Sequence, residues 1–184
     1  RLEARPEPPA RPAPRRQATY MPGGKRYPQT ITGSDGAPMV HVPAGRFIMG
    51  SNEYDDEKPQ RRVYLDGFYI DKYEVTNELY QVFVQATGGE QPRYASDNRF
   101  NTAQQPVMGG SWFDADGYCA WAGLRLPTDA EWEKTARATD GRTYPWGEGI
   151  DADKTNYDNN VGTTTPVGSY PAGVSPYGAY DLAG

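Results

Sequence analysis

The side chains most used for redox and metal chemistry are almost absent from this sequence, which contains one cysteine, Cys119, and one histidine, His41. One cysteine cannot form a disulfide within the chain, and zinc sites are built from several cysteine and histidine ligands. His41 lies in an alternating stretch that predicts a strand, and no Gly-x-Ser-x-Gly motif accompanies it. The sequence therefore predicts neither a Ser-His-Asp triad nor a Cys/His metal centre.

Carboxylates are the remaining candidates for acid–base or cation chemistry. Glu131 follows Thr128 by three residues, which is the spacing of a capping box. We therefore expect Glu131 to cap a helix and Glu133 to pair on the surface, rather than to exchange protons with a substrate. The acidic loop 51–59 lacks the glycine and the spaced ligands of a calcium-binding helix–loop–helix, so we expect a solvated loop there.

Three helices are expected to position these groups, at residues 77–87, 112–122 and 129–138. Thr76 suits the N-cap of the first helix, and Gly88 suits its end. Apolar residues recur at helical spacing in the first two helices and predict their buried stripes. These stripes are Leu79, Val82, Phe83 and Ala86, then Ala115, Tyr118, Cys119 and Ala122.

Cys119 is accordingly expected to be a small, inert core residue. In the third helix, Trp132 and Ala136 are expected to face the core. Alternating apolar residues predict strands at 39–43 and 46–50, within 62–73, and at the short segment 165–167.

The first 30 residues differ in composition from the rest. They hold seven of the 17 prolines and carry seven Lys/Arg against two Glu, whereas the remaining residues carry 12 Lys/Arg against 22 Asp/Glu. Proline fixes φ and removes an N–H donor, so repeated prolines favour an extended chain. We assign residues 1–38 to a basic arm and residues 39–184 to one folded domain.

We expect the arm to lie across another protein chain of an assembly, because it has little apolar surface to offset the entropy of ordering. A membrane surface is the weaker version of the same attachment, and no apolar run reaches the roughly 18 residues of a spanning helix. The acidic body would repel phosphates, so nucleic acid is not an expected partner. The expected partner-binding residues are Arg5, Arg11, Arg15, Arg16, Tyr20 and Tyr27.

Five blocks in order carry a resemblance to a known family. They are Val42-Pro43-Ala44-Gly45-Arg46-Phe47-Ile48-Met49-Gly50; Phe68-Tyr69-Ile70-Asp71 with Glu74-Val75-Thr76-Asn77; Pro106-Val107 with Ser111-Trp112 and Tyr118-Cys119; Arg125-Leu126-Pro127-Thr128-Asp129-Ala130-Glu131-Trp132-Glu133; and Tyr144-Pro145-Trp146-Gly147. Together they resemble the formylglycine-generating-enzyme-like, or sulfatase-modifying-factor, domain. The resemblance implies an elaborated C-type-lectin-like α+β fold, rich in loops, with short helices on small antiparallel sheets.

The family includes oxidases that convert a sulfatase cysteine to formylglycine, sulfoxide synthases of ergothioneine biosynthesis, and many non-catalytic domains. The match stops at Gly184, before the segment that carries the oxidases' copper-binding cysteine pair, so the domain is expected to be truncated. His41 alone cannot supply the histidine cluster of the sulfoxide synthases. The resemblance also implies a structural calcium on Asn156, Tyr157 and Asp158, for which an Asx-turn loop is the alternative.

The first expectation is therefore a non-catalytic structural or binding module of a larger periplasmic or extracellular assembly, close to a membrane and tethered by its arm. The alternative is the N-terminal portion of a formylglycine-generating oxidase acting on a protein cysteine. A third interpretation is a calcium-dependent receptor for a ligand or glycan. No cofactor other than calcium is expected.

Overall fold

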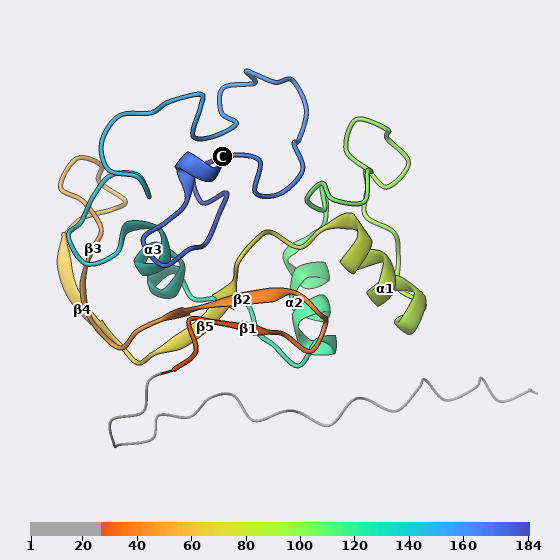
Figure 1. Cartoon of the computed structure of the whole chain (residues 1–184), viewed down its shortest axis with the longest axis horizontal. Coiled ribbons are helices and arrows are strands. Elements are labelled where there is room, and N and C mark those ends of the chain that lie inside the picture. The colour runs from red at the N-terminus through yellow and green to blue at the C-terminus, as the bar shows by residue number, and fades with distance from the viewer. Residues whose placement is uncertain (1–26) are drawn as a thin grey trace, which may run out of the picture.

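The computed structural model describes residues 27–184 as an α+β domain with five strands, three α-helices and one short 3₁₀ helix (Figure 1). This confirms the expected fold class. Most of the chain after the third helix is loop, and it contains only the 3₁₀ helix η1 (Pro171–Gly173). None of the helices in residues 27–184 has the length and apolar content needed to cross a bilayer. The arm residues Arg5, Arg11, Arg15, Arg16 and Tyr20 lie outside the described residues.

Two antiparallel strand pairs form one continuous bent ribbon. β2 (Pro38–Val42) pairs with β5 (Phe68–Asp71), and β3 (Gly45–Met49) pairs with β4 (Arg61–Leu65). The register is the same in both pairs, so the ribbon continues across the bend at residues 43–44 and 66–67. At Gly67 a Cβ atom would lie 3.3 Å from the backbone nitrogen of Ala44, which leaves little room for a larger residue at the bend.

The fifth strand, β1 (Thr30–Thr32), pairs with the other edge of β2. It lies within the range assigned from composition to the arm, so regular structure begins earlier than the proposed boundary at residue 39. The expected strands at 39–43 and 46–50 match β2 and β3, and the expected stretch 62–73 contains β4 and β5. The segment 165–167 is loop and is tied down by a bond from Val167 N to Gln104 O.

The helices begin and end within one residue of the expected positions: α1 (Asn77–Thr87), α2 (Trp112–Trp121) and α3 (Asp129–Arg137). Thr76 caps α1 by accepting a bond from Leu79 N, and Gly88 ends it with a left-handed φ of 67°. Capping boxes start α2 at Ser111 and α3 at Thr128. Local capping chemistry therefore sets these boundaries.

The main apolar cluster lies between α1 and α2, where Tyr80 and Val84 pack against Tyr118 and Ala122. The expected stripe of α2 is correct, with Cys119 partly buried beside it. The expected stripe of α1 is wrong at Val82, which is 50% exposed, because the helix turns Tyr80 and Val84 inward instead.

The third helix corrects another expectation. Trp132 is 46% exposed, so it is not the core residue that the sequence predicted. The buried positions of α3 include Glu131, Lys134 and Thr135, whose polar groups are all hydrogen-bonded. Polar side chains can therefore occupy the inward side of this helix, because their polar groups are hydrogen-bonded there.

Thr128→Ala is expected to lower the free energy of unfolding by about 1 kcal/mol, which is typical of a lost N-cap. The hydroxyl of Thr128 accepts from Glu131 N at 3.2 Å, and the Glu131 carboxylate accepts from Thr128 N at 2.9 Å. Urea unfolding of the variant and the parent chain would measure the change. A variant with an unaltered midpoint would contradict the assigned cap.

Candidate functional site

A hollow of about 390 Å³ opens where the ribbon ends and α1 begins. Asp71 is the last residue of β5, Glu74 lies in the following turn, and Glu78 is in the first turn of α1. Segment 36–38 closes one side, and Gln104 and Val167 contribute from two later loops. The hollow is thus assembled by distant segments and carries three carboxyl groups.

Asp71 is the least compensated of these acids. Its Oδ1 is buried and finds no hydrogen-bond partner among residues 27–184. Burial, followed by the charge of Asp35, raises the pKa of Asp71 to about 7. Asp35 itself accepts bonds from Tyr118 Oη at 2.7 Å and from Ala37 N at 3.0 Å. The pair therefore places one hydrogen-bonded carboxylate beside one that favours its neutral form.

A second pair of acids stands nearby. Glu74 is an exposed residue, and partial desolvation of its carboxyl, followed by the charge of Asp181, raises its pKa. Burial also raises the pKa of Asp181, although a bond of 2.7 Å from Gly168 N partly stabilises its charge. The Lys72 ammonium lies over the rings of Tyr73 and Tyr180, at 5.1 and 5.4 Å, and forms no ion pair with a described residue.

This arrangement can exchange protons near neutral pH and can accept hydrogen bonds from a donor that enters the hollow. Residues 27–184 contain no group of three or more His, Cys, Asp or Glu side chains placed to hold a metal ion. The sequence interpretation used Asp71 and Glu74 only as markers of the fold. What marks these two residues as a candidate site is that carboxyl groups from separate segments come together around them. The spacing of residues along the sequence does not reveal this.

The only cysteine of the sequence lies beside these acids. Burial, followed by the charges of Asp71, Asp116 and Asp35, raises the pKa of the Cys119 thiol to about 11. Such surroundings favour the neutral thiol, which is a poor nucleophile and a poor metal ligand. The expectation of an inert side chain stays a prediction.

The expected calcium ligands lie in the loop formed by residues 151–162, which contains no helix or strand. Asn156 Nδ2 donates to Thr163 O at 2.9 Å, and Tyr157 is partly buried. Asp158 is exposed and has a φ of 49°, a conformation typical of Asx-turn loops. The calcium site therefore stays a prediction.

The remaining expected residues lie apart from the hollow. Tyr27 packs on His41, with ring centroids 5.0 Å apart, and Tyr69 packs on the same imidazole at 5.1 Å. Trp146 stacks on Tyr144 at 5.2 Å and donates from Nε1 to Gly149 O. Glu131 accepts from the Arg125 guanidinium, which contributes most to the low pKa of Glu131, about 2. These contacts give Trp146 and Glu131 structural roles.

A family model described as the sulfatase-modifying factor enzyme 1-like domain matches residues 25–184. The chain is 38% identical over 165 residues to a serine/threonine-protein kinase of Chlamydia caviae, covering 79% of this chain and 26% of the relative. It is 31% identical over 226 residues to the formylglycine-generating enzyme of Bos taurus, covering 89% of this chain and 58% of the relative.

Among solved structures, PvdO from Pseudomonas aeruginosa superposes with a TM-score of 0.71 at 28% identity, covering 86% of this chain and 72% of PvdO. The chain spans about a quarter of the kinase and just over half of the bovine enzyme. The activities of these whole proteins are therefore not transferred by similarity alone.

Proposed function

Because this chain belongs to the sulfatase-modifying factor enzyme 1-like domain family, we propose that it serves as a binding module of a larger extracytoplasmic protein assembly, not as a redox centre. The family match fixes the fold, and relatives with this fold carry names as different as a kinase and a formylglycine-generating enzyme. The role must consequently be argued from this chain's own residues.

The state of Cys119 is the observation that carries the proposal. Oxidation of a substrate thiol through a protein cysteine or a copper ion requires a thiolate ligand or nucleophile. Burial and the charges of Asp71, Asp116 and Asp35 raise the pKa of the Cys119 thiol, so its neutral form is favoured at pH 7. The sequence contains no second cysteine.

The tether is part of the same proposal. The arm is basic and rich in proline, whereas residues 31–184 carry an excess of acidic groups. The stacking of Tyr27 on His41 supports the idea that the arm leaves the body at a fixed point. Beyond that point, Arg5, Arg11, Arg15, Arg16 and Tyr20 are proposed to contact another protein chain near a membrane.

The full 184-residue chain is expected to leave a cysteine-containing sulfatase peptide unoxidised, with or without added copper and in the presence of oxygen. Mass spectrometry of the peptide would detect an aldehyde. Cys119→Ser is the matched control, because it removes the thiol and keeps a small side chain. Aldehyde formation by the parent chain that disappears in Cys119→Ser would refute the proposal.

A second candidate is the front portion of a formylglycine-generating oxidase. The bovine enzyme supports it through 31% identity across 89% of this chain. In that case the catalytic groups would come from outside these 184 residues, and the chain would contribute binding surface. The peptide assay repeated with the complete natural gene product separates the two candidates, since only the oxidase would form the aldehyde.

A further inference from the structure

Among residues 27–184, no strand pairs with the outer edge of β4. In the two-stranded part of the ribbon that these residues form, β4 pairs with β3 alone. Within residues 27–184, the main-chain groups of residues 61–65 make no hydrogen bond besides that ladder. The outer edge of β3 differs, because α3 packs beside it and Lys134 Nζ donates to Gly45 O at 3.1 Å. A five-residue strand therefore presents unused donors and acceptors along one side.

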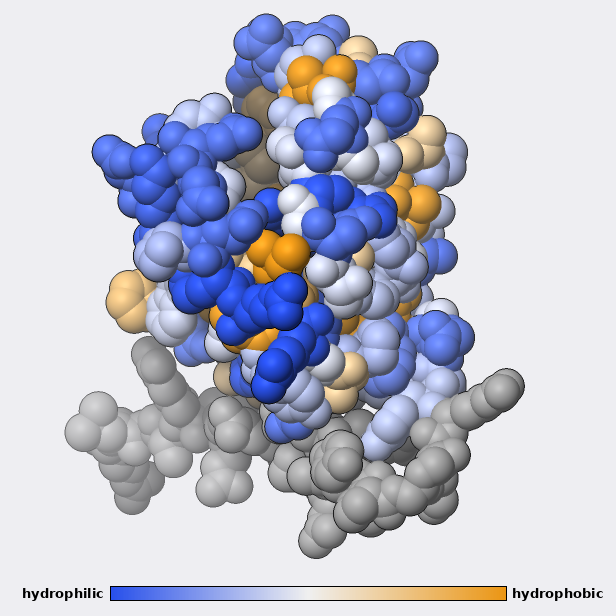
Figure 2. Space-filling model, turned by 90° about the vertical axis from the view of Figure 1, so that its left-hand side faces the viewer, coloured by the Kyte–Doolittle hydropathy of each residue, from blue (hydrophilic) through white to orange (hydrophobic). Residues whose placement is uncertain are grey.

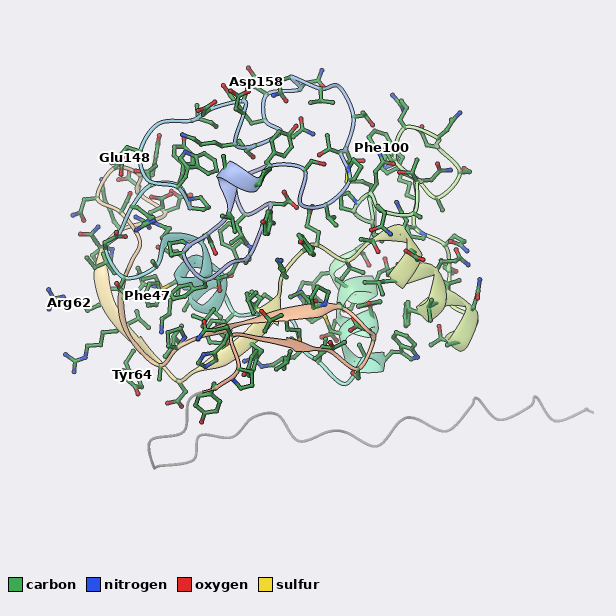
Figure 3. All side chains as sticks on the ribbon, in the orientation of Figure 1. Phe47, Arg62, Tyr64, Phe100, Glu148 and Asp158 are labelled. Atoms are coloured by element: carbon green, nitrogen blue, oxygen red, sulfur yellow. The ribbon has the colours of Figure 1, made fainter. Side chains whose placement is uncertain are left out.

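The side chains on this ribbon are basic and aromatic. Arg46 lies opposite Tyr64 in the ladder, and Ile48 lies opposite Arg62, so these four share one face. Tyr64 is 58% exposed, and both arginines are exposed. Figure 3 shows Arg62 and Tyr64 pointing away from the body while Phe47 points inward, and Figure 2 shows this side with deeply hydrophilic residues around a small apolar spot.

The charges of these arginines are not compensated by neighbouring acids within residues 27–184. Among residues 27–184, Arg46, Arg61 and Arg62 form no ion pair, whereas Arg99, Arg125 and Arg142 each pair with an acid at 2.7 Å or less. The Arg61 guanidinium contacts only Pro59 O and Met49 Sδ, both at 3.4 Å. These three arginines thus form a basic patch on the ribbon, between the acidic loop 51–59 at its tip and Asp66 at its bend, and residues 31–184 as a whole carry 22 acids against 12 cations.

The geometry points to this edge as the docking site for an extended acidic segment of a partner protein, which adds to β4 as a further strand. The inference rests on the proposed binding function and names the chemistry of its partner. Main-chain bonds to β4 would supply affinity, and alternate carboxylates would lie next to Arg62 and reach towards Arg46, which is one strand further away on β3. Arginine suits this role because its planar group holds a carboxylate through two parallel hydrogen bonds.

Charge complementarity favours an acidic peptide at this edge over three other occupants: the chain's own arm, a second copy of the chain and a nucleic acid. The chain's own arm carries seven Lys/Arg against two Glu in residues 1–26, so the arginines of β4 would repel it. A second copy paired edge to edge through β4 would bring Arg61 and Arg62 close to their own counterparts, which is unfavourable. A nucleic acid or other long polyanion would extend onto the acidic body and be repelled there.

The test uses the full 184-residue chain and a labelled synthetic nine-residue peptide that alternates glutamate with threonine. Fluorescence anisotropy is expected to show salt-sensitive binding. The double variant Arg46→Glu/Arg62→Glu is expected to weaken it about tenfold or more. Arg93→Glu, an exposed arginine away from the ribbon, is the matched control and should leave binding unchanged. Arg46→Gln/Arg62→Gln guards against misfolding of the charge-reversed variant and should show an intermediate loss.

A peptide methylated on alternate main-chain nitrogens distinguishes strand addition from simple charge attraction. It keeps the carboxylates and should lose binding to the parent chain. Equal binding of the methylated peptide overturns the inference, as does no binding of the unmodified peptide. Capture of heparin or anionic phosphatidylserine vesicles through Arg46 and Arg62, without peptide binding, overturns it as well. None of these results bears on the aldehyde assay, so the two proposals fail separately.

Discussion

Lys134→Ala is expected to lower the free energy of unfolding by about 4 kcal/mol, the largest loss among the changes considered. The Lys134 side chain is 1% exposed, and its Nζ donates to Pro43 O at 2.7 Å and to Gly45 O at 3.1 Å. These carbonyls flank the bend of the ribbon. Alanine would leave a cavity and two poorly satisfied acceptors, so helix α3 would lose its tie to the ribbon.

Urea unfolding measures this loss, and two further variants interpret it. Lys134→Met keeps most of the volume and removes the donor, so it should cost about 2 kcal/mol. Lys58→Ala removes an exposed lysine whose partner Asp55 is almost fully exposed, and should change stability by less than about 0.5 kcal/mol. If Lys134→Ala were as mild as Lys58→Ala, the assigned link between α3 and the ribbon would be wrong.

Lys134 also shows where sequence reasoning ends. The helix boundaries were predictable, because caps such as Thr76, Thr128 and Gly88 act on their immediate neighbours. The inward side of α3 was predicted only at Ala136, which is buried as expected. Lys134 was missed because periodicity identifies inward positions by their apolar side chains and Lys134 is polar. Its burial depends on the carbonyl groups of Pro43 and Gly45, about 90 positions earlier in the chain. The sequence around Lys134 does not predict these contacts.

In the ribbon and the hollow too, features set by neighbouring residues were predictable, and features set by distant contacts were not. Alternation located the strands, but their common register across the bend depends on how residues 43–44 and 66–67 approach each other. The hollow could not be predicted from spacing. Asp71 and Glu74 meet Asp35 and Asp181 only after the ribbon, the first helix and the last loop have packed together.

Asp71→Asn is expected to stabilise the domain by about 2 to 3 kcal/mol more at pH 8 than at pH 5. The Asp71 carboxyl is buried, lacks a hydrogen bond on Oδ1 and stands close to Asp35. Its pKa is about 7 in the folded chain and about 3.9 in the unfolded chain. Folding must therefore place a charge at an unfavourable position above pH 7, and asparagine avoids that cost.

The sign follows from proton linkage. A folded-state pKa that lies above the unfolded value means that the folded chain holds the proton more strongly between about pH 4 and pH 7. Stability contributed by Asp71 is therefore full at low pH and is lost as pH rises through that interval. Glu131 and Asp140, with pKa values of about 2, act in the opposite direction and only in acid, where their stabilising charges are lost.

The window from pH 5 to pH 8 contains the titration of the raised acids Asp71, Glu74 and Asp181, and also that of His41, whose lowered pKa acts in the opposite direction. Urea unfolding of the parent chain should show stability falling across this window, and Asp71→Asn should flatten the fall. Glu74 titrates in the same direction, so part of the slope should remain in the variant. Asp66→Asn, an exposed carboxyl on the same ribbon, is the matched control and should preserve the slope. An Asp71→Asn chain whose stability falls as steeply as the parent's would show that the Asp71 carboxyl is not held neutral by the fold.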